Sequence, residues 1–274
     1  MDPRLQRRVQ RYGWDKAAAQ YERFWARQLE PAQTRMFDLA ALGAGEQVLD
    51  VACGTGLITF RAQRAVGPGG RVMAIDISDE MVQAVCQAAL EQGASNVTTE
   101  RMDAEELRLM DASFDAALCA LGLMYCPEPG NALREMLRVL KPGGRLAVAV
   151  WGARPRCGWA EIFPIVERRV SSDVCPLFFQ LGTGDALSYA MEQAGFVGIV
   201  SERLATTLHY ETGEDACGAA FAGGPVAMAY SRFDDATREA AYAEYLASIE
   251  PFRDGAGYAV PGEFVVARAR KAVP

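Results

Sequence analysis

Histidine and lysine are nearly absent from this chain of 274 residues. It has one histidine, His209, and three lysines, so 25 of its 28 basic residues are arginine. A zinc site takes three or four nitrogen, sulfur or oxygen ligands, often several of them histidine. The sequence therefore excludes a histidine-built metal centre, and we predict no metal site. The scarcity of lysine also argues against catalysis through a lysine imine.

Paired cysteines, a targeting segment and long apolar runs are missing too. The seven cysteines include no C-x-x-C pair, and the Arg-rich start has no apolar stretch typical of a signal peptide. We therefore predict reduced thiols in a cytoplasmic protein. No run of about 18 apolar residues occurs, so no membrane span is predicted. The net charge of −7 disfavours nucleic acid as a partner, whereas a homodimer is left open.

The first 45 residues predict a helical segment. Trp14, Ala18, Tyr21 and Trp25 recur at spacings of three and four, which places them on one helix face. Pro31 is expected to end this helix, and a second one follows to about Leu42. We interpret residues 1–45 as a helical lid.

From residue 46, short apolar runs alternate with helical stretches. The pattern predicts strands at 47–52, 71–77, 96–102, 114–121 and 145–151, with helices at 55–66, 79–92 and 129–140. Strands that alternate with helices of this length indicate β-α-β crossovers and a parallel sheet. The fold class is therefore α/β, with residues 46–206 and 259–274 forming the sheet domain.

The rhythm changes after residue 151. A helix interrupted at Pro164 is predicted at 157–170 and another helix at 185–195. A long strand is predicted at 196–210 and a last strand at 263–270. The intervening stretch is too long for a hairpin loop, and we predict that residues 207–258 form a helical substrate cap. Its large apolar side chains either enclose an acceptor or only pack the cap: Phe221, Met228, Tyr230, Phe233, Tyr242 and Tyr245.

A glycine-rich turn in VLDVACGTG (48–56) is the strongest local signal. A strand ends at Asp50, and a helix is expected to begin near Thr55. Gly54 and Gly56 let a ligand approach the backbone, and a helix N-terminus offers free N–H groups. About 20 residues later a second strand ends in Asp76, whose carboxylate can accept both hydroxyls of a ribose. The two features predict a site for an adenosine-like ligand.

The turn favours S-adenosylmethionine over a dinucleotide. In the pattern G-x-G-x-x-G the third glycine is replaced by Thr59, and Asp50 stands just before the loop. A carboxylate repels a pyrophosphate but attracts a sulfonium that carries an amino group. A nicotinamide oxidoreductase remains the alternative at this point.

Five segments, DVACGTG, AIDIS, MDAEEL, FDAALCALGLMYCPEP and LRVLKPGGRLAVAVW, resemble in order and spacing the motifs of class I S-adenosylmethionine-dependent methyltransferases. They are most similar to the ubiquinone/menaquinone biosynthesis group and its small-molecule relatives. The resemblance implies a Rossmann-like, seven-stranded, mostly parallel sheet with helices on both faces and an antiparallel last strand. It also implies methylation of a small molecule, here an aromatic or quinone-like acceptor at oxygen or carbon. N-methylation of a small amine, or a non-catalytic S-adenosylmethionine-binding module, is the alternative.

The resemblance also implies roles for residues. The turn Ala52–Gly56 would hold the methionine part of the cofactor, Asp76 the ribose, Ile77 the adenine face and Asp103 the adenine amine. Asp50 and Asp103 have capping a turn and a helix as alternatives. The full cofactor set is Tyr21, Asp50, Ala52, Cys53, Gly54, Thr55, Gly56, Asp76, Ile77, Met81, Asp103, Ala104, Ala120 and Leu121.

A general base is harder to assign. Many relatives carry His-Trp where this chain has Met124-Tyr125, so the histidine base that they offer is absent. The remaining candidates for a catalytic role are His209, Tyr125 and Tyr21.

Overall fold

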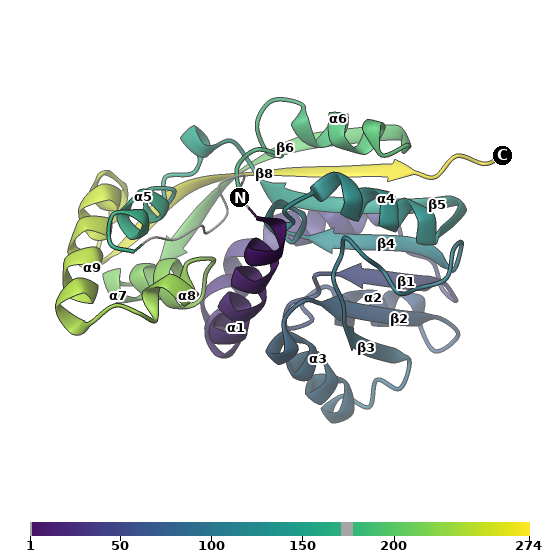
Figure 1. Cartoon of the computed structure of the whole chain (residues 1–274), viewed down its shortest axis with the longest axis horizontal. Helices are drawn as coiled ribbons and strands as arrows, with labels where there is room; N and C mark the ends of the chain where they lie inside the picture. The colour runs from purple at the N-terminus through teal and green to yellow at the C-terminus, as the bar shows by residue number, and fades with distance from the viewer. Residues whose placement is uncertain (1, 171–177) are drawn as a thin grey trace.

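A central sheet organises the chain, of which the computed structural model describes residues 2–170 and 178–274. Its order is β3-β2-β1-β4-β5-β8-β6, and a two-residue strand β7 pairs with β8. The strands are β1 (Gln47–Val51), β2 (Arg71–Asp76), β3 (Val97–Arg101), β4 (Phe114–Ala120), β5 (Leu140–Trp151), β6 (Val197–Tyr210), β7 (Arg253–Asp254) and β8 (Gly257–Arg270). Strands β1 to β5 pair in parallel, whereas β8 lies antiparallel between β5 and β6 (Figure 1). The predicted Rossmann-like α/β class is confirmed.

Helices cover both faces of this sheet. Figure 1 shows α4 in front of the strands and α2 behind them. The crossover helices are α2 (Thr59–Val66), α3 (Asp79–Glu91), α4 (Pro129–Val139) and α6 (Ala186–Gln193). Within the described residues, no helix has the length and apolarity needed to cross a membrane.

The N-terminal helix α1 (Pro3–Ala40) is continuous, so the predicted break at Pro31 is wrong. Proline lacks the N–H that would bond four residues back, which weakens the helix at that point. The helix continues because the residues around Pro31 are packed into the core, with Leu29, Ala32 and Met36 all buried. Burial of this apolar stripe outweighs the lost hydrogen bond.

Helix α2 begins at Thr59 rather than near Thr55. Ala52, Gly54 and Gly56 have φ values of +55°, +54° and +97°, and a right-handed helix cannot include such residues. Residues 52–58 therefore remain a turn, which gives the ligand site more exposed backbone than the sequence predicted.

The helix predicted around residue 160 is shorter in the structure. In place of one helix over 157–170, the described residues contain α5 (Ile162–Glu167), in which Pro164 lies in the first turn. Proline is well tolerated there because the N–H groups of the first turn have no intrahelical partner.

The last strand, β8, begins at Gly257, six residues before the predicted start, because β6 pairs with it from Val197 to Tyr210.

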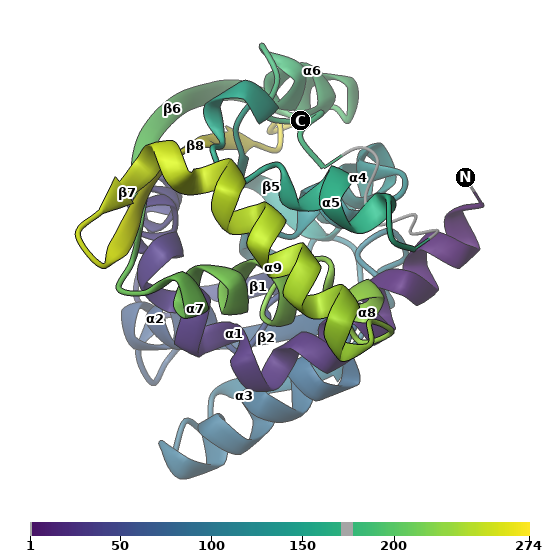
Figure 2. The same ribbon diagram turned by 90° about the vertical axis from the view of Figure 1, so that its left-hand side faces the viewer.

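The segment between β6 and β8 is largely helical. It contains α7 (Gly213–Cys217), a π-helical turn (Gly218–Ala222), α8 (Ala227–Tyr230) and α9 (Asp235–Ile249). The sequence Gly223-Gly224-Pro225 lies between the π turn and α8 and interrupts the helical segment there. Figure 2 shows α7, α8 and α9 gathered beside α1.

Candidate functional site

A pocket lies where the carboxyl ends of β1, β2 and β4 meet α1, the edge at which open α/β sheets bind ligands. It contains about 980 Å³ of space between atoms, its open mouth included. One end is lined by acidic and small residues from the strand ends, and the other by aromatic residues. We call these the acidic end and the aromatic end.

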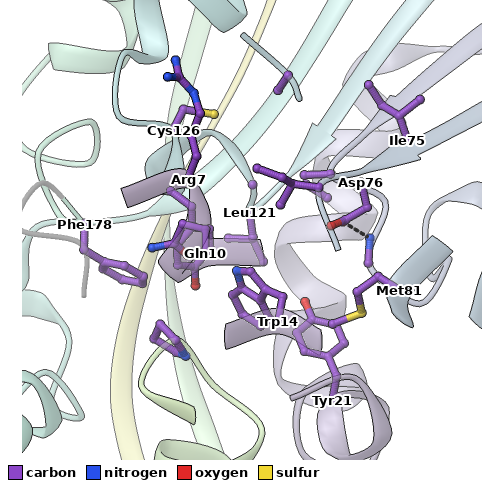
Figure 3. Close-up of a pocket in the computed structure, with 18 of the residues that line it drawn as sticks. Arg7, Gln10, Trp14, Tyr21, Ile75, Asp76, Met81, Leu121, Cys126 and Phe178 are labelled. Carbon is purple, nitrogen blue, oxygen red and sulfur yellow. Dashed lines mark hydrogen bonds between the residues drawn. The ribbon is translucent and has the colours of Figure 1, made fainter. Parts of the chain in front are cut away.

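At the acidic end, Asp76 ties the glycine turn to the start of α3. One carboxylate oxygen accepts the Gly54 N–H at 3.0 Å (Figure 3). The other accepts the Ser78 N–H at 2.9 Å. Burial nevertheless raises the pKa of Asp76 to about 6, because desolvation outweighs these backbone hydrogen bonds. The carboxylate is thus held in place and poised for a positively polarised or hydroxyl-bearing ligand.

Asp50 lies just beneath the same turn and is fully buried. One of its oxygens accepts the Thr59 hydroxyl at 2.6 Å, whereas Oδ1 is buried without a hydrogen-bond partner among the described residues. Desolvation raises the pKa of Asp50 to about 7, and the nearby charge of Asp76 adds to the rise. Such a group favours a cation nearby.

Asp103 follows β3 and is held by α1. Its carboxylate accepts the Glu105 N–H at 2.9 Å and pairs with the Arg7 guanidinium at 2.9 Å. Arg7 also pairs with Glu105, whose side chain is buried, so α1 is fastened over this end of the pocket. One turn further along α1, Arg11 pairs with Asp79 at the start of α3.

The floor of the pocket is made by the ends of β1 and β4. Leu121 directly follows β4 with a φ of +63° and Ala52 directly follows β1 with a φ of +55°. A Cβ added at Gly122 would stand 2.3 Å from the Cβ of Ala52. The two loops are therefore in direct contact, and non-glycine residues held at positive φ are typical of functional sites.

The aromatic end is built from four separate parts of the chain. Trp14 of α1 packs edge-on against Tyr125, with ring centroids 5.1 Å apart, and Tyr125 against Phe178 at 5.4 Å. Three indoles continue this wall, with Trp151 and Trp159 4.8 Å apart and Trp25 6.0 Å from Trp151. An end lined in this way suits a flat apolar ring.

The structure brings most of the predicted site residues to this pocket. Those that line it are Tyr21, Ala52, Gly54, Asp76, Ile77, Met81, Asp103, Ala104, Ala120, Leu121 and Tyr125. Four others lie behind the wall: Asp50, Cys53, Thr55 and Gly56. Burial raises the pKa of the Cys53 thiol well above its usual value. The thiol therefore stays protonated, and the residue only fills space in the turn.

His209 lies away from the pocket. Its backbone N–H donates to the Gln28 side-chain oxygen at 3.0 Å, whereas its imidazole is exposed on β6. It is therefore poorly placed to act as a base in the pocket. Tyr21 lines the pocket, but burial raises the pKa of its hydroxyl, so this group is a hydrogen-bond donor at neutral pH.

The cap contributes less to the pocket than the sequence predicted. Gly224 and Pro225 line it, whereas Phe221 packs on Tyr230, Tyr242 and Tyr245 with ring centroids 5.1–5.8 Å apart. Of the two alternatives for these aromatic residues, the structure supports packing within the cap.

Several lining residues were missed by sequence reasoning. They are Arg7, Gln10, Trp151, Trp159 and Phe178. Trp151 could have been found, because it ends strand β5 just as Asp50 and Asp76 stand at the ends of theirs. Arg7 lies 96 and 98 positions before Asp103 and Glu105, with which it pairs, and no local pattern marks such contacts.

Fold and pocket together define a Rossmann-like class of protein with a pocket at the carboxyl edge of its sheet. Within that class, residues 42–159 match the family model described as a methyltransferase domain. The match covers less than half of the chain, and it confirms the resemblance to methyltransferases seen in the five sequence segments.

Curated relatives and solved structures are similar in different parts. The ubiquinone/menaquinone biosynthesis C-methyltransferase UbiE of Pseudomonas paraeruginosa is 38% identical over 153 residues, which are 56% of this chain and 58% of that protein. The chain thus matches somewhat over half the length of this relative. The [4+2]-cyclase SpnF is 24% identical, with a TM-score of 0.58 over 89% of this chain and 81% of that one. Phosphoethanolamine N-methyltransferase 2 of Haemonchus contortus, solved with S-adenosyl-L-methionine, is 16% identical, with a TM-score of 0.62 over 94% of this chain and 57% of that one. The structural likenesses support the fold alone.

Proposed function

We propose that the protein transfers a methyl group from S-adenosylmethionine to a small, planar, oxygen-bearing acceptor such as a quinone precursor, at oxygen or carbon. The observation that carries the proposal is the division of one pocket into an acidic end and an aromatic end. A methyltransferase domain over residues 42–159 supports the first reactant, and the quinone chemistry named for the UbiE relatives supports the second.

The acidic end fits the cofactor. Asp76 would accept the ribose hydroxyls, Asp103 the adenine amine, and the turn at 52–56 would hold the methionine part. Ile77 and Met81 offer an apolar wall for the adenine. Behind this wall, Asp50 Oδ1 and the Thr55 hydroxyl are buried without a hydrogen-bond partner among the described residues, and the carboxylate of Asp50 favours a ligand that carries positive charge.

The cofactor, when bound, supplies an electrophilic methyl group on a positively charged sulfur. The protein's own contribution is alignment and the exclusion of water. The rings of Trp14 and Tyr125 fix the plane of the acceptor, and the floor at Leu121 sets its distance from the acidic end. The ring of Tyr21 lines the pocket, and its hydroxyl stays protonated at neutral pH because burial raises its pKa.

The three parts of the chain have distinct roles in this proposal. Residues 1–45 act as a lid, because Arg7 and Arg11 fasten α1 across the acidic end. Residues 46–206 and 259–274 carry the strand ends that hold the cofactor. Residues 207–258 support the lid from outside and reach the pocket at Gly224 and Pro225.

An amine acceptor is the second candidate in the same class. It is less well supported, because the acidic residues that line the pocket are Asp76, Asp103 and Glu105, all at the acidic end. An ammonium at the aromatic end would have aromatic faces for attraction, but no lining carboxylate from the described residues.

Two measurements test the proposed function. Calorimetry should detect binding of S-adenosylmethionine and none of NAD; the reverse result would overturn the cofactor assignment. The full chain should then be incubated with S-adenosylmethionine labelled in its methyl group and, without oxygen, 1,4-dihydroxynaphthalene. We expect a labelled product that is heavier by one methylene, detected by mass spectrometry. Transfer to an amine such as 1-(aminomethyl)naphthalene, with none to the hydroquinone, would refute the acceptor class.

A further inference from the structure

Gln10 places an uncharged amide within the aromatic end of the pocket. It belongs to α1, is 5% exposed and lines the pocket. Figure 3 shows it between Phe178 and Trp14, with Leu121 next to it. An amide in such surroundings is costly to bury unless its polar atoms are hydrogen-bonded, so its presence indicates a polar partner on this wall.

We propose that Gln10 is the specificity-determining residue for the acceptor, and that its amide forms a hydrogen bond with a neutral oxygen on the acceptor ring. This inference rests on the proposed function. A glutamine amide has two N–H donors and a carbonyl oxygen with two lone pairs. It can therefore bind an acceptor oxygen, as carbonyl or hydroxyl, in addition to contacts within the wall.

The charges in the pocket explain why the oxygen is neutral. Arg7 is the cationic side chain that lines the pocket, and its guanidinium is already paired with Asp103 and Glu105. An anionic acceptor would have no unpaired cation among the described lining residues. An ammonium acceptor would have the amide oxygen of Gln10 but no lining carboxylate beside it. A carbonyl or hydroxyl group matches an amide without a charge to balance.

The position of Gln10 is fixed from both sides along the same helix. Arg7, three residues before it, is fastened by two ion pairs, and Trp14, four residues after it, packs on Tyr21 and Tyr125. Residues at these spacings share one helix face. The amide is thus held rigidly against the pocket, as discrimination between acceptors requires.

The chain offers a matched control for Gln10. Gln6 lies one turn earlier on α1 and is equally buried, at 4% exposed, but does not belong to the pocket lining. A purely structural role for buried glutamines would make substitutions at both positions behave alike. A role in recognising the acceptor would separate them.

The test measures binding rather than turnover, with three ring probes of similar size. These are 1-naphthol, naphthalene and 1-(aminomethyl)naphthalene, titrated into the full chain loaded with S-adenosylhomocysteine. We expect the wild type to prefer 1-naphthol over naphthalene. Gln10→Leu should weaken 1-naphthol about fivefold to tenfold, the size of one neutral hydrogen bond, and leave naphthalene and S-adenosylhomocysteine unchanged. Gln10→Glu should shift the preference towards the amine, and Gln6→Leu should change no ratio between probes.

Each contrary result overturns the inference. It fails if the wild type shows no preference for 1-naphthol, if Gln10→Leu keeps that preference, or if Gln6→Leu removes it equally. The proposed function fails separately: S-adenosylhomocysteine would not bind, or no methyl would be transferred, while probe preferences and their dependence on Gln10 remain measurable by titration into the full chain alone.

Discussion

Replacing Asp50 by asparagine should stabilise the ligand-free protein while weakening the cofactor site. Asp50 is fully buried, and its pKa is raised from 3.8 to about 7, chiefly by desolvation. A native pKa above the unfolded value means that the folded state binds more protons between these two pH values. The free energy of unfolding therefore falls as pH rises through this window and levels off above pH 7.

The magnitude follows from the size of the shift. About three pKa units at about 1.4 kcal/mol each give roughly 4 kcal/mol as the cost of ionising Asp50 in the folded state. Asparagine keeps an acceptor for the Thr59 hydroxyl, but its amide nitrogen finds no partner where Oδ1 now lies. We therefore expect Asp50→Asn to raise the free energy of unfolding by about 2–4 kcal/mol at pH 8 and by almost nothing at pH 4.

Urea unfolding of both proteins at pH 4, 6 and 8 without cofactor measures this difference. Asp115→Asn is the matched control, because pairing with Lys141 lowers the pKa of Asp115, so that its loss should destabilise the protein at pH 8. Calorimetry at pH 8 should show S-adenosylmethionine binding to Asp50→Asn at least tenfold more weakly. A difference in unfolding free energy that does not change with pH, or a variant less stable than wild type at pH 8, would refute the reasoning.

Three further variants probe the lid, the floor and the boundary of the pocket. Arg7→Met leaves the buried Glu105 carboxylate without its cation; we expect a loss of about 2–4 kcal/mol in urea unfolding at pH 8, and a loss below 1 kcal/mol would argue against the fastened lid. Gly122→Ala places a Cβ 2.3 Å from that of Ala52, so the two loops of the pocket floor must move apart. Calorimetry should then show at least tenfold weaker S-adenosylmethionine binding, and unchanged binding would contradict the contact between the two loops. Tyr21→Phe keeps the ring that lies 3.7 Å from the Cβ position of Gly54; its cofactor affinity should stay within about threefold of wild type, whereas Tyr21→Ala should lose tenfold or more.

Much of the site could be predicted because parallel strands end at one edge. Asp50, Asp76 and the turn between β1 and α2 are local features, and the crossover pattern is enough to place their strand ends side by side. The exposure of His209 was also predictable in principle. Leu208 and Tyr210 are buried and His209 between them is exposed, as the two-residue period of a strand requires.

The rest depends on contacts between distant segments. Arg7 and Asp103 are 96 positions apart, and the sequence around each gives no sign of the other. The aromatic end draws on α1, the end of β5 and the residues after it, so only the tertiary fold brings Trp25, Trp151 and Trp159 together. The sequence overstated how many aromatic side chains of residues 207–258 reach the pocket. A short helical segment must first bury its own aromatic side chains, and Phe221 does so against α9.

Helix α1 joins the two ends of the pocket in one rigid element. Arg7 holds the carboxylates at the acidic end, and Gln10 and Trp14 form the wall of the aromatic end within two turns of it. Asp103 is both the partner of Arg7 and the proposed ligand of the adenine, so the cofactor would share one carboxylate with the ion pair that holds the acceptor wall. With this assignment, binding at one end would change the free energy of binding at the other, and by thermodynamic linkage the effect would be equal in both directions. Such coupling would make the acceptor bind best at the aromatic end after the cofactor has bound. This order of binding keeps water away from a reactive methyl group.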